Sequence, residues 1–319
     1  MVLTIASLIG GFIYLLGGAD LLVRGAVALA RRARVPPIIV ALTVVALGTS
    51  LPELVVSVHA ALTGYPGIAL GNAVGSNIAN VLLVGGGAAI IYPLANPGGS
   101  IRRDTAMMMI ASVVFLLFCL TGNLNRTAGV IFLLGLLAVM VPTVQDGVRA
   151  HYESAGKAPM EIVLGLPAHR PVIFLFIFTG LAFLPIGARM VVASAVEIAG
   201  RVGISETVVG LTVIAFSTSL PELATTVVAA RRKETEVAIG TLVGSNTFNI
   251  LAIMGVAGVL APNGISVPSL FPVLDLPVML ATSLFITILA WTGRPLGRKA
   301  GIILSVGYVA YVGALLVFV

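Results

Sequence analysis

Two glutamates, Glu53 and Glu222, stand inside strongly apolar stretches of this 319-residue chain. A carboxylate near the centre of a bilayer costs at least about 2.5–3.5 kcal/mol, so such groups usually face a cavity and mark an ion or proton path. Both glutamates end the same pentapeptide, TSLPE. Packing alone does not explain two copies of so costly a placement, and we interpret both residues as cation-binding.

Oxygen atoms surround each glutamate. Thr49 and Ser50 precede Glu53 by four and three residues, so in a continuous helix both hydroxyls share the carboxylate's face. Pro52 has no N–H and presses on the carbonyl four residues back, so we expect carbonyls from Ala46 onward to lose helical partners and face a cavity. The matching residues near Glu222 are Thr218, Ser219, Pro221 and Ala215.

A second polar motif follows each glutamate by one helix. Asn72, Ser76 and Asn80 are spaced four apart, which predicts a polar stripe on one helix face. The equivalent stripe in the other copy is Thr241, Ser245 and Asn249. Asn77 and Asn246 lie about 100° away around the helix and are expected to cap helix ends or bond backbone.

These groups favour a hard cation. Ca²⁺ takes 6–8 oxygen ligands in flexible geometry, whereas Zn²⁺ or Cu⁺ prefers Cys or His. The single cysteine, Cys119, lies in an apolar run, and His59 is off the face of Glu53. Two carboxylates neutralise one Ca²⁺, and hydroxyl and carbonyl oxygens also suit Na⁺. Competition between the two ions for one site would be a natural antiport mechanism.

The composition predicts a helical membrane protein. Hydrophobic residues make up 59% of the chain and charged residues 9%, against about 25% charged in soluble domains. The apolar runs approach the ~20 residues that span a bilayer and lack the alternation of barrel strands. The first 30 residues lack a basic n-region and a cleavage site, so we expect a retained helix. Ten helices are predicted, over residues 3–30, 37–62, 68–93, 104–122, 126–147, 171–199, 206–230, 237–261, 272–292 and 299–318.

The basic residues sort by loop and predict an orientation. The loops after the odd-numbered helices hold fourteen Lys and Arg, whereas the other loops hold Arg126 and Arg201. Basic loops stay in the cytoplasm, so both termini are expected in the periplasm of a bacterial inner membrane. This sorting also explains the net charge of +6 without nucleic-acid binding.

An internal duplication organises the chain. Residues 43–54 match residues 212–223 at nine of twelve positions, and the same offset of 169 aligns residues 71–80 with 240–249 at six of ten. Each half holds five predicted helices, an odd number, so the copies would insert in opposite orientations. The expected organisation is a first repeat over 1–148 (motif 43–80), a cytoplasmic linker over 149–169 and a second repeat over 170–319 (motif 212–249).

At these motifs the chain resembles the cation/calcium exchanger superfamily, in its prokaryotic sodium/calcium exchanger branch. The resemblance rests on GTSLPE, STSLPE, GNAVGSNIAN and GTLVGSNTFN, and covers nearly the whole chain. It implies secondary active antiport of Ca²⁺ and Na⁺ by alternating access, with Glu53 and Glu222 as ligands shared by the two ions. The other implied site residues are Thr49, Ser50, Ser76, Thr218, Ser219, Ser245, the carbonyls of Ala46 and Ala215, and Asn80 and Asn249 at the centre.

Two departures from the family pattern bear on the ions. Ser217 replaces an expected glycine, and Asn249 stands where potassium-dependent relatives carry Asp, which argues against K⁺ co-transport. A Ca²⁺/H⁺ antiporter remains the nearest alternative, since desolvated carboxylates protonate readily. A membrane hydrolase fits less well, because the duplication supplies the same chemistry twice rather than complementary roles. A passive channel is a further alternative, which flux without a counter-ion would reveal. We expect no enzyme activity, organic cofactor, nucleic acid or required protein partner.

Overall fold

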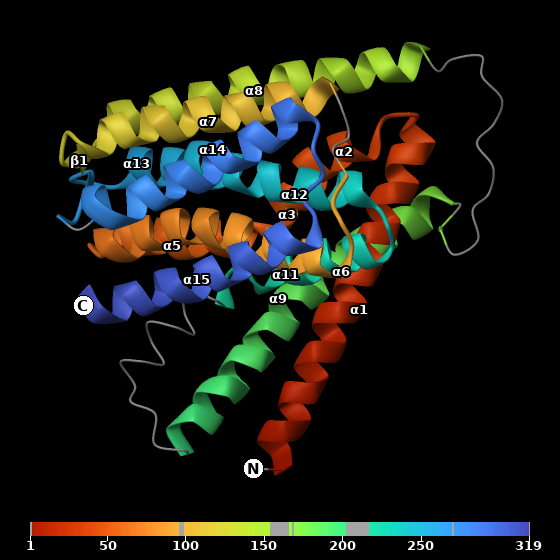
Figure 1. Ribbon diagram of the computed structural model, residues 1–319, viewed down its shortest axis with the longest axis horizontal. Coiled ribbons are helices and arrows are strands. Elements are labelled where there is room, and N and C mark those ends of the chain that lie inside the picture. Colours follow the sequence, from red (N-terminus) through yellow and green to blue (C-terminus); the bar gives the residue numbers. More distant parts are fainter. Residues whose placement is uncertain are drawn as a thin grey trace.

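The computed structural model describes residues 2–95, 99–153, 166–167, 169–201, 217–269 and 271–318, and these are almost entirely helical (Figure 1). The elements up to residue 153 are α1 (Val2–Ala33), α2 (Pro37–Val40), η1 (Ala41–Val45), α3 (Ala46–Thr49), α4 (Leu51–Leu62), α5 (Pro66–Ala79), η2 (Asn80–Gly85), α6 (Gly86–Ile91), α7 (Gly99–Cys119), β1 (Asn123–Leu124) and α8 (Arg126–Glu153). The later elements are α9 (Arg170–Arg201), α11 (Leu220–Arg231), α12 (Thr235–Phe248), η3 (Asn249–Ile253), α13 (Met254–Leu260), β2 (Ile265–Ser266), η4 (Phe271–Asp275), α14 (Leu276–Thr292) and α15 (Arg298–Phe318). Segments labelled η are π-helical.

The chain is a multi-pass membrane protein. Among the described residues, seven helices are long and apolar enough to cross a membrane, or eight if the bent segment Pro37–Leu62 is one span. Of the other two predicted spans, α7 carries three charges near its start, and 206–230 lies partly outside the described residues. The predicted linker is also largely outside them, and α8 continues to Glu153, beyond its predicted end at residue 147.

Helices α1 and α9 cross each other on glycines and lie at a steep angle to most other helices (Figure 1). A Cβ added to Gly180 would lie 2.7 Å from the carbonyl oxygen of Gly18, and one added to Gly187 would lie 2.7 Å from that of Gly11. Any larger residue would therefore force the backbones apart. Gly11 and Gly18 are 169 residues before Gly180 and Gly187, so the two contacts are equivalent under the sequence offset.

The helices that carry the polar motifs are the most enclosed. Eleven residues of α12 are buried, including the polar residues Thr241, Ser245, Asn246 and Thr247. Around this centre α13 packs on α8, α14 on α7, and α15 on α6. The polar side chains therefore lie among helices rather than toward lipid.

Two short backbone pairings join loops at opposite ends of the bundle. Strand β1 pairs antiparallel with β2, which ties the loop after α7 to the loop after α13. Leu94 pairs with Leu296 in an isolated bridge. The sequence predicts neither pairing, because two residues are too few to show a strand's alternation.

Candidate functional site

Helix breaks place both glutamates in the first turn of a new helix. Ser50, with φ −86° and ψ 6°, separates α3 from α4, and the chain bends by 47° there. Ser219 has nearly the same backbone, φ −83° and ψ 0°, before α11. Proline at the start of each helix accounts for the break, because it lacks an N–H and is tolerated only in a first turn. Glu53 and Glu222 then lie at helix N-termini, where the helix dipole stabilises a carboxylate.

The two carboxylates are buried and near each other. Glu53 and Glu222 are each 1% exposed, and they are close enough to repel one another electrostatically. In an apolar interior this repulsion is weakly screened. The pair therefore favours a bound cation.

The hydroxyls before Glu53 serve the glutamate of the other half. Ser50 Oγ donates to Glu222 Oε1 over 3.2 Å, and the Thr49 hydroxyl also lies beside Glu222. The expected continuous helix is instead broken at Ser50, and the hydrogen bond that Ser50 makes is to the glutamate of the other half. Ser76 Oγ and Thr218 Oγ1 also meet across the halves, 3.4 Å apart.

The Ala46 carbonyl is not released from its helix. It accepts the Ser50 N–H over 3.1 Å and the Thr49 hydroxyl over 3.3 Å, so it keeps its helical partner, contrary to expectation. Pro52 lacks the N–H group that would donate to the carbonyl of Gly48, four residues earlier. Ala215, predicted to have the same role in the other half, lies outside the described residues.

Four asparagines form a reciprocal network at the centre. Asn77 Nδ2 donates to the backbone oxygen of Asn246 over 3.3 Å, and Asn246 Nδ2 donates to that of Asn77 over 3.4 Å. Asn80 Nδ2 donates to Asn246 Oδ1 over 3.0 Å, and Asn249 Nδ2 donates to Asn77 Oδ1 over 2.9 Å. Asn77 and Asn246 thus bond backbone as predicted, but across the halves. The four hydrogen bonds form two equivalent pairs, because the residues of one bond in each pair correspond to those of the other at the sequence offset of 169.

The amide donors in this network leave Asn80 and Asn249 with free carbonyl oxygens. Both Oδ1 atoms are buried without a partner. A π-helical segment begins at each residue, η2 at Asn80 and η3 at Asn249. Such widened turns occur frequently at functional sites. The sequence predicts the polar stripe but not these turns.

Buried oxygen atoms without a hydrogen-bond partner gather around the same residues. Among the described residues they include Glu53 Oε2, Glu222 Oε2, Asn80 Oδ1, Asn249 Oδ1, Ser219 Oγ, Ser245 Oγ, Thr225 Oγ1 and Thr226 Oγ1. Each unsatisfied buried group costs about 1–3 kcal/mol. A bound cation would satisfy several at once.

The oxygen character of the site limits the metals that it suits. Within the described part of the chain, no three His, Cys, Asp or Glu side chains converge. Any cation held here would therefore depend on hydroxyl, amide and carbonyl oxygens beside two carboxylates. This donor set suits Ca²⁺ or Na⁺.

Sequence reasoning placed Asn72 in the polar stripe without predicting its partners, and it missed Ser57, Thr225 and Thr226. Asn72 Nδ2 donates to the backbone oxygen of Glu53 over 3.0 Å and to Ser57 Oγ over 2.8 Å, which holds α5 against α4. Thr225 and Thr226 are buried on α11 just after Glu222. Continuing the repeat alignment would have pointed to Thr226, which matches the hydroxyl residue Ser57, but not to Thr225, which matches Val56.

Comparisons with known proteins agree with one another. The family model described as sodium/calcium exchanger protein matches residues 3–143 and 172–317. The chain is 36% identical to the inner membrane protein YrbG of Escherichia coli, over 99% of this chain and 97% of that protein. It is 31% identical to the sodium/calcium exchanger MaX1 of Methanosarcina acetivorans, over 94% and 95% of the two chains. A structure of the sodium-calcium exchanger NCX_Mj soaked with Na⁺ and Ca²⁺ matches with a TM-score of 0.84 and 27% identity, over 99% of both chains.

Proposed function

Because the chain belongs to the sodium/calcium exchanger protein family, whose members are transporters rather than catalytic enzymes, we propose that it exchanges Ca²⁺ for Na⁺ across the membrane. The observation that carries the proposal is the cluster of unpartnered oxygens around Glu53 and Glu222. Two carboxylates balance the charge of one Ca²⁺, and the neutral oxygens complete a flexible shell of the kind that Ca²⁺ takes. The transported ions are the substrates, and the proposal requires no organic cofactor or protein partner.

In the proposed site, Glu53 and Glu222 bind both ions in turn. The further ligands are hydroxyl, amide and carbonyl groups from both halves: Thr49, Ser50, Ser76, Asn80, Thr218, Ser219, Ser245, Asn249 and the carbonyls of Ala46 and Ala215. The Ser50 to Glu222 bond and the Ser76 to Thr218 contact support a site shared between the halves. Ca²⁺ and Na⁺ exclude each other because they would use the same carboxylates.

Coupling follows from the charge of the empty site. Two buried carboxylates without a cation have a high electrostatic free energy in a low-dielectric interior. The conformational change that moves the site across the membrane would therefore be rapid only when bound ions neutralise both carboxylates. We propose alternating access between ten helices arranged as two inverted five-helix repeats, residues 1–148 and 170–319, joined by the linker. The reciprocal asparagine bonds and the matched glycine contacts of α1 and α9 support this arrangement. The basic loops support periplasmic termini in an inner membrane.

The test is ⁴⁵Ca²⁺ uptake into proteoliposomes with imposed Na⁺, K⁺ or pH gradients. We expect an outward Na⁺ gradient to drive uptake, and Glu53→Gln or Glu222→Gln to reduce it to the level of empty liposomes. Gln keeps the size of the side chain but removes the charge that balances Ca²⁺. The matched control is Glu153→Gln, at the exposed end of α8, which we expect to transport normally.

Other outcomes would point elsewhere. Uptake driven by a pH gradient without Na⁺ would favour a Ca²⁺/H⁺ antiporter, and a requirement for K⁺ would favour a potassium-dependent one. Flux without any counter-ion would indicate a channel. Undiminished exchange in the protein carrying both Gln substitutions would refute the proposed site.

A further inference from the structure

The two glutamate helices are covered unequally. Helix α1 lies against α11, whereas its counterpart α9 makes no comparable contact with α4 within the described part of the chain. Leu51 and Val55 of α4 are 46% and 67% exposed. Their counterparts at the offset of 169, Leu220 and Ala224 of α11, are 5% and 8% exposed. In the proposed topology α11 runs toward the cytoplasm and α4 toward the periplasm, so α1 covers the cytoplasmic side.

An ion pair joins α1 to the end of α11. Arg232, the C-cap of α11, donates from Nε to Asp20 Oδ1 over 2.6 Å, and its Nη2 contacts the same oxygen. Asp20 Oδ2 accepts a hydrogen bond from Arg24 over 3.3 Å. Arg24 also belongs to α1 and moves with it, so of the two contacts only the one with Arg232 links the helices.

The equivalent positions in the other half do not hold opposite charges. Arg189 stands at the position of Asp20, and Thr63 at that of Arg232. Thr63 ends α4 with nearly the backbone of Arg232, φ −95° and ψ 6° against φ −81° and ψ −1°, and donates its hydroxyl to the His59 carbonyl over 2.7 Å. Arg189 is exposed and forms no ion pair with any residue that the structure describes. An ion pair at this position can therefore form in one half only.

We propose that Asp20 and Arg232 form a latch that favours the state with the cytoplasmic side closed, an inference that rests on the proposed alternating access. Inverted repeats exchange roles when access alternates, so the other state has α9 over α4 and α11 uncovered. Opening the cytoplasmic side breaks the ion pair, and no ion pair replaces it on the opposite side. The two side chains are 33% and 37% exposed, and pairs of this kind shift an equilibrium by up to about fivefold.

The test measures the distance between α1 and a helix of the surrounding bundle. Spin labels are attached to the full chain at two exposed positions, through Ile13→Cys on α1 and Val309→Cys on α15, with the buried Cys119 replaced by Ala. Double electron–electron resonance in lipid nanodiscs then reports the fraction of the protein at each distance. We expect one main distance and a minor one, and Asp20→Asn should raise the ratio of minor to main up to about fivefold. Arg232→Gln should act to the same extent, and the two substitutions together should add nothing, because either one removes the pair.

A second variant supplies the missing ion pair. In the state with α9 over α4, Thr63→Asp places a carboxylate where Arg189 can meet it. We expect Thr63→Asp to raise the minor distance up to about fivefold as well, and to lose this effect when it is combined with Arg189→Gln. The matched control is Arg231→Gln, which removes the exposed cation next to Arg232 and should leave the distances unchanged.

Three results would overturn the latch. The first is an Asp20→Asn protein with the same distances and fractions as the labelled native chain. The second is an equal response to Arg231→Gln and Arg232→Gln, which would indicate a general effect of charge. The third is an effect of Thr63→Asp that persists beside Arg189→Gln. The distance measurement requires no transport, so these results are distinct from a failure of the proposed Ca²⁺ and Na⁺ exchange, which the uptake assay detects.

Discussion

Glu53 and Glu222 occupy equivalent breaks, but hydrogen bonds hold the first more firmly than the second. Near Glu53, Asn72 bonds both the glutamate's backbone oxygen and Ser57, and Ser57 donates to the Ala69 carbonyl over 3.3 Å. Helix α4 is therefore fastened to α5. Near Glu222, the residue equivalent to Asn72 is Thr241, which turns its hydroxyl back to its own helix at Val237, 2.8 Å away. No comparable side-chain bond joins α11 to α12 among the described residues.

The second half has buried hydroxyl oxygens without hydrogen-bond partners at the positions where the first half has hydrogen bonds between α4 and α5. Thr226 stands at the position of Ser57, and Thr225 at that of Val56. Both threonine hydroxyls are buried without a partner. Both halves share the helix break, the glutamate and the asparagines, and these shared features define the cation chemistry. The halves differ in how many hydrogen bonds hold the helix that carries the glutamate. We expect α4 and α5 to separate less easily than α11 and α12.

The largest effect should be the same in both halves. Asn77→Ala and Asn246→Ala each delete a reciprocal backbone bond and leave a central amide of the other half without its partner. Each buried group left unsatisfied costs about 1–3 kcal/mol. We expect equal and large decreases in the unfolding temperature, measured in one detergent, and little change for the exposed control Asn263→Ala. A clear inequality between the two variants would show that the centre is not equivalent in the two halves.

An intermediate effect should distinguish the halves. Asn72→Ala removes two bonds between α4 and α5, so we expect it to lower the free energy of unfolding by about 1–3 kcal/mol. Thr241→Ala removes only the hydrogen bond from the Thr241 hydroxyl to the Val237 carbonyl of the same helix. A hydrogen bond of this kind adds little stability and can bend the helix that contains it. Hydrogen exchange should speed up in α4 of the first variant and stay nearly unchanged in α11 of the second. Equal changes would remove the contrast between the two glutamate helices.

Local sequence predicted much of this architecture, because hydropathy and proline act locally. The apolar run predicts a helix over 37–62, and α2 to α4 occupy those residues. The duplication located both glutamates and both asparagine stripes. The order of the elements is thus readable from the chain.

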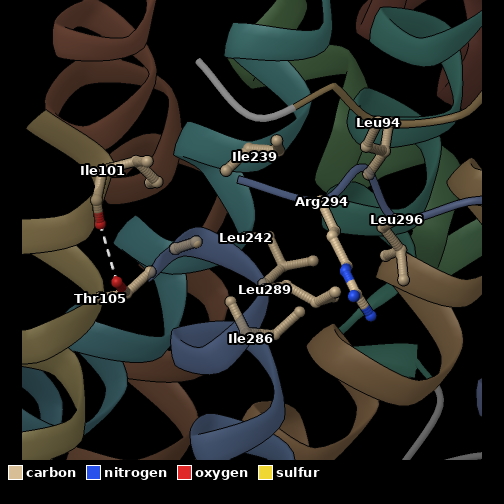
Figure 2. A pocket seen from close by; sticks show the side chains of 10 residues that line it. Leu94, Ile101, Thr105, Ile239, Leu242, Ile286, Leu289, Arg294 and Leu296 are labelled. Atoms are coloured by element: carbon tan, nitrogen blue, oxygen red, sulfur yellow. Dashed lines mark hydrogen bonds between the residues drawn. The ribbon is translucent and has the colours of Figure 1, made fainter. Parts of the chain in front are cut away.

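Contacts between the halves were not readable from the sequence. The hydrogen bond from Ser50 to Glu222 joins residues 172 apart in sequence, so helical spacing within one half does not predict it. A small pocket between α7, α12 and α14 (Figure 2) is lined by residues from three helices and two loops, so no sequence periodicity predicts it. Thr226 is a different case, because a longer repeat alignment matches it to Ser57, and only its lack of a partner required a structure.

The smallest effect should have opposite signs in the two halves. Ser57→Ala removes the partner of Asn72 and should destabilise the cation-free protein by about 1 kcal/mol. Thr226→Val replaces an unpartnered buried hydroxyl by a methyl group of similar size, so it should be neutral or stabilising without Ca²⁺. Unfolding temperatures measured with and without Ca²⁺ check both predictions.

The same measurement tests whether the Thr226 hydroxyl is a cation ligand. If it is, the Thr226→Val protein binds Ca²⁺ more weakly, so Ca²⁺ should raise its unfolding temperature less than that of the native protein. A loss of stability without Ca²⁺ would mean that Thr226 already has a partner, and the contrast between the halves would then rest on Asn72 alone.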